Sequence, residues 1–328
     1  MSANSSAQAK MQQLNKKFRV TGISSGVISG LTYGIYTTLV LVAGLYEPLL
    51  SAVGLLAVPF VTSGLNDFFA GIWLLFYNGG KGRLKEISRS LNTFPGKMIV
   101  LGALVGGPVA NGAYLAGLAM AGAYAIPISA TCSLFGSLFA WIFLKQKPTK
   151  RVVLGMVICV AGAITINWVK PEGSPNFTMG IVCAFIAAIS WGLEGVISSY
   201  GGSMLDTDVA VNIRELVSGI VTLIVIVPLV SALPLLSGTV TAGMPMFILA
   251  LSGLSAAISF LCWYKANAMV GCAIGMSLNV TYAFWGIFFC VLFLGEVLTP
   301  TIVAGSVVIV IGAIIVTMNP LDLLKKEA

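Results

Sequence analysis

Long apolar stretches alternate with short polar segments along the chain, and this pattern predicts helices that cross a membrane. Apolar stretches of roughly 20 residues recur from Gly22 to Thr317, and a helix of that length crosses about 30 Å of hydrocarbon. The pattern therefore predicts an all-α integral membrane protein with polar tails at 1–20 and 319–328. The ten predicted transmembrane helices are 21–43, 52–76, 98–119, 123–144, 151–169, 178–200, 210–233, 245–266, 270–294 and 300–318.

The overall composition agrees with this pattern. Of the 328 residues, 58% are hydrophobic and 9% are charged, and the mean hydropathy is +0.99. A soluble domain carries about 25% charged residues, so this chain cannot build a water-exposed surface over a compact fold. The composition excludes a soluble protein and leaves no segment long enough for a separate soluble domain.

Basic residues lie in short blocks between the apolar stretches, and their placement predicts the orientation in the membrane. In the ten-helix topology, 15 of the 18 Lys and Arg residues lie on one side, with four in the N-terminal tail, five in the loop 79–97, four in the turn 145–151 and two in the C-terminal tail. Cytoplasmic loops carry an excess of Lys and Arg. We therefore expect a bacterial cytoplasmic membrane protein with both termini in the cytoplasm and the lipid bilayer as a partner. We do not expect nucleic acid as a partner, because the net charge of +7 comes from these blocks.

The two halves of the chain are related in sequence. Shifting the chain by 150 residues superposes 135–164 on 285–314 with twelve identities in thirty positions, whereas apolar composition alone gives about 10% identity. We therefore predict two repeats of five helices, 21–169 and 178–318. Because five is odd, the second repeat enters the membrane in the opposite direction. Inverted repeats of this kind are typical of secondary transporters that work by alternating access.

Several short motifs resemble the EamA-like branch of the drug/metabolite transporter superfamily. The resemblance covers the chain from about residue 22 to 319, although the first repeat reads Phe-Leu-Lys-Gln at 143–146 where the family often has Gly-Glu. It implies ten helices around a central cavity, lined mainly by the first, third and fourth helices of each half and by parts of the second. Choline importers exist among the proteins that the chain resembles. The motifs are an aromatic-Gly pair in the first helix of each half, Tyr33-Gly34 and Trp191-Gly192, then Phe-Leu-Gly-Glu at 293–296 and the glycines Gly305 and Gly312.

Glycine and proline interrupt several predicted helices and indicate where the backbone departs from regular geometry. Gly106-Gly107-Pro108 and Pro228 lie inside predicted spans, where the backbone carbonyls that proline frees can line a cavity or act as hinges. Small residues at every fourth position allow helices to approach closely. The first predicted helix carries such a series, at Gly22, Gly26, Gly30 and Gly34.

Five ionisable residues lie inside predicted membrane helices. Each costs about 2.5 to 3.5 kcal/mol at the membrane centre, so most must face the interior of the bundle, although Lys265 can extend its amine to the membrane surface. We predict a gating or coupling role for Asp67, Arg214 and Glu215. A purely structural ion pair of Arg214 with Asp67 or Glu194 is the alternative, and the sequence leaves both open.

An unusual number of amphipathic aromatic residues lies away from the ends of the predicted helices. Trp191 and Glu194 are three residues apart and share one helix face, and aromatic rings around a carboxylate suit an organic cation. The alternative is that some of these rings only pack against neighbouring helices. The predicted substrate-binding residues are Tyr33, Tyr36, Tyr114, Trp191, Glu194, Trp263, Tyr264, Tyr282 and Trp285.

These observations predict a secondary transporter of a small organic solute, with a cationic or zwitterionic amine such as choline as the substrate. An exporter of amino acids or other metabolites is the main alternative, and a non-transporting membrane scaffold is another. A proton or another ion is a further candidate partner for the buried charges. The chain has no histidine, no metal-ligand spacing, no nucleophile paired with a base and no phosphate-binding loop. We therefore expect no enzymatic activity, no cofactor and no metal site.

Overall fold

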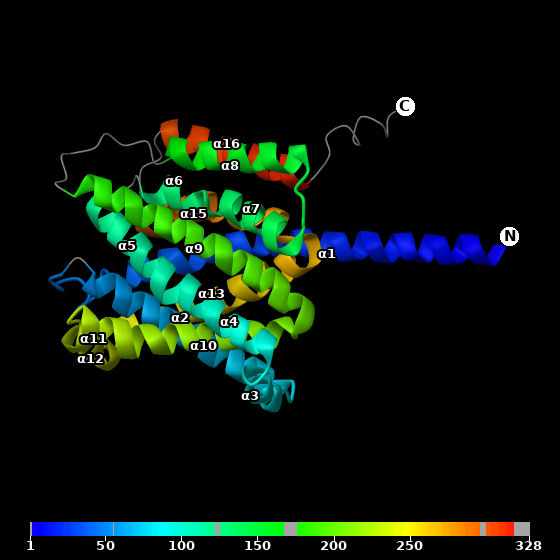
Figure 1. Cartoon of the computed structure of the whole chain (residues 1–328). Coiled ribbons are helices and arrows are strands. Elements are labelled where there is room, and N and C mark those ends of the chain that lie inside the picture. The colour runs from blue at the N-terminus through cyan, green and yellow to red at the C-terminus, as the bar shows by residue number, and fades with distance from the viewer. Residues whose placement is uncertain (1, 55, 122–124, 167–175, 296–299, 318–328) are drawn as a thin grey trace.

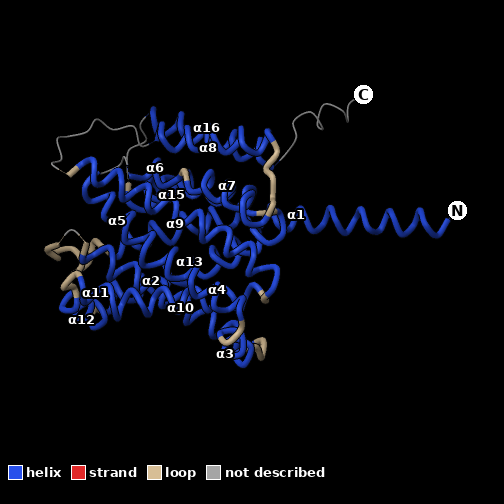
Figure 2. The backbone as a smooth tube through the Cα atoms, viewed as in Figure 1, coloured by secondary structure: helices blue, strands red, loops and turns tan. Residues whose placement is uncertain are grey.

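The computed structural model describes residues 2–54, 56–121, 125–166, 176–295 and 300–317, and these residues are almost entirely helical with no strand (Figures 1 and 2). Glu296 of the family motif lies outside the described residues. The helices of the first half are α1 (Ser2–Ala43), α2 (Ala57–Gly80), α3 (Leu84–Leu91), α4 (Phe94–Leu104), the π-helical segment η1 (Val105–Val109), α5 (Ala110–Ala121), α6 (Ala125–Ala130), α7 (Cys132–Leu144) and α8 (Lys150–Ile166). Those of the second half are α9 (Phe177–Met204), α10 (Thr207–Val221), the π-helical segment η3 (Thr222–Ile226), α11 (Val227–Leu229), α12 (Leu233–Thr241), α13 (Gly243–Val270), α14 (Cys272–Asn279), α15 (Tyr282–Leu294) and α16 (Pro300–Thr317).

The all-α membrane fold predicted from the sequence is confirmed. Among the described residues, seven helical stretches are long and apolar enough to cross a membrane. The other three predicted spans coincide with shorter helices, namely α6 with α7, α8, and α16. The short helices α3 and α12 were not predicted, because eight or nine residues are too few to give a clear periodic signal.

Local sequence signals explain where two of the helices begin. Thr93 precedes α4, and its hydroxyl accepts a hydrogen bond from the Gly96 amide at 3.2 Å. Asp206 likewise caps α10, where its carboxylate accepts from the Asp208 amide at 3.1 Å. Capping residues satisfy backbone donors that have no partner in the first turn of a helix. Both helices therefore begin a few residues earlier than hydropathy alone predicts.

The predicted breaks in helical geometry are present. The segment η1 contains Pro108, and η3 ends two residues before Pro228. Proline has no amide hydrogen, and a wider π-turn relieves the clash of its ring with the preceding turn. The sequence signal from Gly106-Gly107-Pro108 therefore indicated the position of η1 correctly.

Helix α1 extends well beyond the rest of the bundle (Figure 1). Its 42 residues correspond to a length of roughly 63 Å at 1.5 Å per residue, about twice the thickness of the hydrocarbon layer. Every described side chain from Lys10 to Val20 is exposed, and the first buried residue is Gly22. The predicted N-terminal tail is thus a continuation of the first membrane helix.

Helices from the two halves pack on each other in a reciprocal pattern. Helix α1 packs on α13 and α15, and α9 packs on α5 and α7, while α2 packs on α10 and α8 on α16. The pair α8 and α16 forms one side of the bundle (Figure 1). The first helix of each half therefore packs against helices of the other half, which supports the predicted repeat relation.

Glycines allow the closest of these contacts. In α1, a Cβ atom at Gly34 would lie 2.7 Å from the Gly286 amide nitrogen, and in α9 a Cβ atom at Gly192 would lie 2.9 Å from that of Gly136. The backbones come this close because Gly34 and Gly192 have no side chain. The close packing predicted for the glycine series of α1 is confirmed, because Gly22, Gly26 and Gly30 also meet residues of α13, α14 or the turn after α14.

Exposed ion pairs join the end of α2 to the start of α10. The Lys81 amine lies 2.6 Å from Asp208, and the Arg83 guanidinium lies 2.6 Å from Asp206 and 3.3 Å from Asp208. The hydrogen bond that Lys81 donates to Asp208 raises the pKa of the lysine. Such exposed pairs contribute about 0 to 1 kcal/mol each.

The predicted orientation can be tested by chemical labelling. In a variant without native cysteines, we expect a single cysteine at Ser88 in α3 to react only from the cytoplasm and one at Ser51, between α1 and α2, only from outside. Both residues are exposed, and the reason for the expected sides is the excess of Lys and Arg near Ser88. Reaction of an impermeant maleimide with intact cells, before and after lysis, measures this. Labelling of both positions from the same side would contradict the topology.

Candidate functional site

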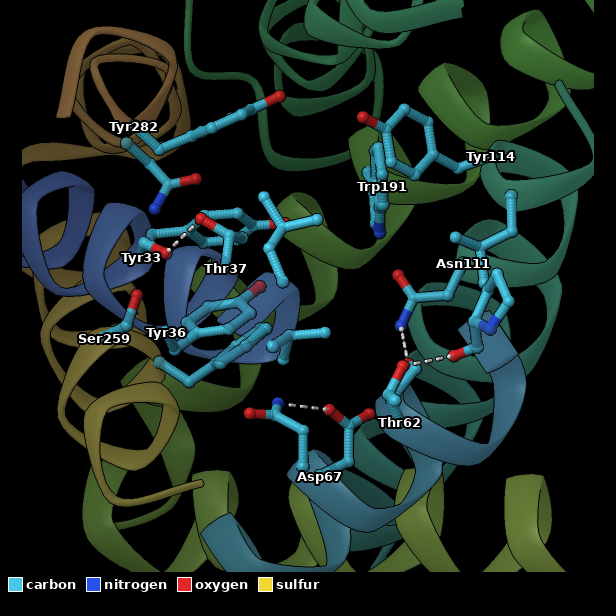
Figure 3. A pocket seen from close by; sticks show the side chains of 18 of the residues that line it. Tyr33, Tyr36, Thr37, Thr62, Asp67, Asn111, Tyr114, Trp191, Ser259 and Tyr282 are labelled. Atoms are coloured by element: carbon cyan, nitrogen blue, oxygen red, sulfur yellow. Dashed lines mark hydrogen bonds between the residues drawn. The ribbon is translucent and has the colours of Figure 1, made fainter. Parts of the chain in front are cut away.

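A cavity of about 690 Å³ lies in the interior of the bundle. It is bounded by α1, α2, α5, α9 and α13, with contributions from the start of α7, from α14 and from the start of α15 (Figure 3). The aromatic lining residues are Tyr33, Tyr36, Tyr114, Trp191, Phe260, Trp263 and Tyr282, and the polar ones include Thr37, Thr62, Ser63, Asn66, Asp67, Asn111, Glu194, Ser259 and Asn279.

The structure brings most of the predicted binding residues together. Seven of the nine line the cavity, and Asp67, predicted for gating or coupling, also lines it. Tyr264 and Trp285 are not among the lining residues. Tyr264 is fully buried behind the cavity, and Trp285 packs against aromatic residues of its own helix α15. Arg214 and Glu215 also lie outside the lining.

Aromatic rings face the cavity from two sides (Figure 3). On one side, the ring centre of Tyr33 lies 4.5 Å from those of both Tyr36 and Tyr282. On the other side, the rings of Tyr114 and Trp191 are 5.2 Å apart. Tyr33 and Tyr36 share a face of α1 because they are three residues apart. The helical spacing and the packing of α1 on α15 therefore create the first group, and the packing of α9 on α5 creates the second.

Uncharged polar side chains also line the cavity, in addition to the two aromatic groups. The Asn111 amide donates to the Ser63 hydroxyl at 3.3 Å, and the Asn279 amide donates to the Ser29 hydroxyl at 2.8 Å. Ser63 and its neighbour Thr62 both line the cavity, although neither was predicted from the sequence. Small hydroxyl residues are common in membrane helices, where many bond only to their own backbone, so nothing in the sequence distinguishes these two.

A cluster of buried charges lies against one wall of the cavity. The Arg214 guanidinium is 2.7 Å from Glu194, 3.0 Å from Glu215 and 3.6 Å from Asp67. The side chains of all four residues are at most 5% exposed. The guanidinium carbon also lies 3.9 Å from the ring centre of Phe260. Arg214 thus forms ion pairs with both of the partners considered from the sequence and with its neighbour Glu215.

The three carboxyl groups of this cluster have different surroundings. Glu194 receives two bonds from Arg214, and the Tyr264 hydroxyl lies 3.5 Å away. Asp67 accepts from the Ser218 hydroxyl at 2.6 Å and from the Asn66 amide at 3.2 Å. The second oxygen of Glu215, Oε2, is buried without a hydrogen-bond partner among the described residues. The cluster therefore holds three carboxyl groups around one fixed positive charge.

The cavity lining has a negative character. Asp67 and Glu194 both line the cavity, whereas no Lys or Arg is among the described lining residues. Arg214 points its donors at carboxylates and its flat face at Phe260. Within the described residues, no group of three or more His, Cys, Asp or Glu side chains is arranged to hold a metal ion. The charged part of this site is thus suited to a positively charged organic group.

A family model for EamA-like transporters matches residues 20–168 and again residues 178–318. The chain belongs to the EamA-like transporter family. It is therefore an integral membrane protein of a ten-helix transporter family whose members carry small solutes, as the sequence motifs predicted. The family is one of transporters and not of enzymes. The two matched segments correspond closely to the two predicted repeats.

Two individual proteins are similar to this EamA-like chain. It is 27% identical over 194 residues to protein LicB of Haemophilus influenzae, a match that covers 57% of this chain and 63% of LicB. The matched segment is thus less than two thirds of the relative's length. A solved crystal structure superposes with a TM-score of 0.67 at 15% identity and covers 92% of this chain and 97% of the other. At that identity the likeness supports the fold alone.

Proposed function

We propose that this EamA-like protein is a secondary transporter of a cationic amine, with a quaternary ammonium compound such as choline as its substrate. The observation that carries the proposal is the composition of the cavity wall. Tyrosine and tryptophan rings face the cavity from two sides, two carboxylates lie beside them, and no basic residue is among the described lining residues. Aromatic faces attract an organic cation by about 2 kcal/mol or more when water is excluded.

The charges of the site favour a cation over a zwitterion. A zwitterionic amine or amino acid would bring its carboxylate into a cavity lined by Asp67 and Glu194. The nearest fixed positive charge is Arg214, and its donors already face Glu194 and Glu215. A buried carboxylate without a partner is costly, so the cavity discriminates against such a substrate.

The position of the cavity supports alternating access. Its lining extends to Gly44 and Leu45 at the end of α1 and to Val58 and Pro59 at the start of α2. Toward the opposite end of α9, the Asn267 amide donates to the Ser198 hydroxyl at 2.7 Å and closes the contact between α9 and α13. We propose that this arrangement is the outward-open state and that the inverted repeats exchange conformations to give the inward-open state.

Asp67, Arg214 and Glu215 are proposed to couple transport to an ion. Three buried carboxyl groups around one guanidinium would carry an excess of negative charge, which is costly in the membrane interior. Binding of a proton by one of them would relieve the excess, and release of the proton would favour the other conformation. A proton is therefore the coupling ion that best fits these residues.

Calorimetric titration of the purified protein tests the proposed substrate. We expect choline and tetramethylammonium to bind, because both present a methylated cation to the aromatic rings. Choline has a neutral analogue of the same shape, 3,3-dimethylbutan-1-ol, in which carbon replaces nitrogen. We expect this alcohol to bind at least about tenfold more weakly, since cation–π attraction and the carboxylates act only on the charged compound.

Glycine betaine and alanine complete the comparison, because each carries a carboxylate. We expect both to bind more weakly than choline. Tighter binding of alanine than of choline would instead support an amino acid exporter. Absence of binding for every cation, in protein that unfolds cooperatively, would refute the proposed substrate class.

A further inference from the structure

The π-helical segment η1 packs against α9, which carries Trp191 and Glu194, and against α10, which carries Arg214. Its residue Gly106 accepts a hydrogen bond from the Trp191 indole, with 3.1 Å between Nε1 and the carbonyl oxygen. Trp191 lines the cavity, and so does Glu194 one turn further along α9. The same residue Gly106 thus contacts one of the aromatic walls through its carbonyl group.

The α-carbon of Gly106 lies against the carboxylate of Glu194. A Cβ atom at this position would overlap with Glu194 Oε2 and with the carbon that bears it. Glycine is the only residue that leaves this space free. The adjacent Gly107 has the same role for a different group, because a Cβ atom there would overlap with the Ser218 hydroxyl, which donates to Asp67.

The π-turn explains why the Gly106 carbonyl can accept a side-chain bond. In a regular α-helix the Ala110 amide would donate to the Gly106 carbonyl, but in this turn it donates to the carbonyls of Val105 and Gly107 instead. A buried carbonyl without a partner is unfavourable, and the Trp191 indole supplies one. The indole is thereby held in one orientation relative to the carboxylate of Glu194.

We propose that Gly106 is a positioning residue that sets the relative placement of Trp191 and Glu194, and thereby the affinity of the cavity for a cation. This inference rests on the proposed cation transport. Gly106 itself offers no charge and no aromatic ring. Its absent side chain admits the carboxylate, and its carbonyl oxygen fixes the indole, so that both recognition groups face the cavity from one turn of α9.

The experiment compares choline affinity in Gly106→Ala, in Glu194→Asp and in the double variant. We expect Gly106→Ala to weaken choline binding at least about tenfold, because the new methyl group displaces the carboxylate. Aspartate is one methylene shorter than glutamate, so the double variant has room for both groups. We expect it to bind choline at least about threefold more tightly than Gly106→Ala alone. A residue that only supported the fold would show no such rescue.

Two control variants, Gly102→Ala and Trp263→Phe, separate the positioning role from general effects on packing. Gly102 is one turn away in α4, where a Cβ atom would lie 2.9 Å from the Ile197 side chain of α9, outside the cavity lining. Gly102→Ala should change choline affinity less than about twofold.

Trp191→Phe removes the indole donor, whereas Trp263→Phe removes an Nε1 group that is buried without a partner among the described residues. The first should weaken choline binding at least about threefold more than the second.

The outcomes distinguish this inference from the proposed function. The positioning role would be overturned if Gly106→Ala bound choline as tightly as wild type, or if the double variant bound choline no more tightly than Gly106→Ala. Neither result would contradict the proposed transport of choline. Failure of wild-type protein to bind any cation would refute the proposed substrate instead. If Gly106→Ala does not fold, the comparison of Trp191→Phe with Trp263→Phe decides the matter, and equal losses would overturn the inference.

Discussion

Arg214→Met is expected to lower the free energy of unfolding by about 3 to 5 kcal/mol, because it leaves buried carboxylates without their positive partner. The guanidinium forms ion pairs with three carboxyl groups, and the side chains of all four residues are at most 5% exposed. Methionine retains most of the apolar length of the side chain and its packing against Phe260. The measurement is reversible unfolding in mixed micelles, followed by tryptophan fluorescence.

Arg83 provides a matched control for this prediction. It also pairs with two carboxylates, Asp206 and Asp208, but its side chain is 32% exposed. Arg83→Met should therefore cost no more than about 1 kcal/mol. We further expect Glu194→Gln and Glu215→Gln, introduced together into Arg214→Met, to recover much of the lost stability because they remove the unpaired charges. A loss of less than about 1 kcal/mol in Arg214→Met would show that the cluster is neutral or hydrated.

Glu194→Gln is expected to weaken the binding of choline by roughly 5- to 150-fold, which corresponds to about 1 to 3 kcal/mol. The substitution keeps the size of the side chain and removes the negative charge beside the aromatic rings. The neutral analogue 3,3-dimethylbutan-1-ol has no charge to lose, so its affinity should change less than about twofold. Titration calorimetry with the two ligands measures both effects in the same preparation.

The carboxylate of Glu47 serves as the control for a general effect of charge. It lies in the segment between α1 and α2, outside the cavity lining, and accepts a hydrogen bond from Ser51. Glu47→Gln removes the same charge and should leave choline affinity unchanged. Equal affinity of wild type and Glu194→Gln for every cationic ligand would remove Glu194 from the recognition site.

The sequence predicted the elements of this fold better than their contacts. Hydropathy, together with glycine and proline residues, predicted the positions of the membrane helices, and Gly106-Gly107-Pro108 indicated the π-turn. These signals act within a single helix. The repeat of 135–164 in 285–314 has a spatial counterpart in the reciprocal contacts Gly34 to Gly286 and Gly192 to Gly136. The inverted orientation of the repeats stays a prediction.

The partners of individual side chains could not be predicted in the same way. Arg214 and Glu194 are 20 residues apart, and whether they meet depends on how α10 is rotated relative to α9. Tyr114 and Tyr264 occupy equivalent positions in the predicted repeats, yet only Tyr114 lines the cavity. In any one conformation of a transporter, equivalent residues of the two halves have different surroundings. The repeat in the sequence does not indicate which of two equivalent residues lines the cavity.

The length of α1 has a practical consequence for imaging. A chain of 34.2 kDa surrounded by a micelle offers little protein outside the membrane for aligning particles in electron cryomicroscopy. The exposed part of α1, from Lys10 to Val20, is continuous with the buried part of the same helix (Figure 1). A compact soluble protein fused in helical register to residue 10 would therefore be held at a fixed angle to the bundle. Such a fusion would serve as a fiducial marker without contacting the cavity.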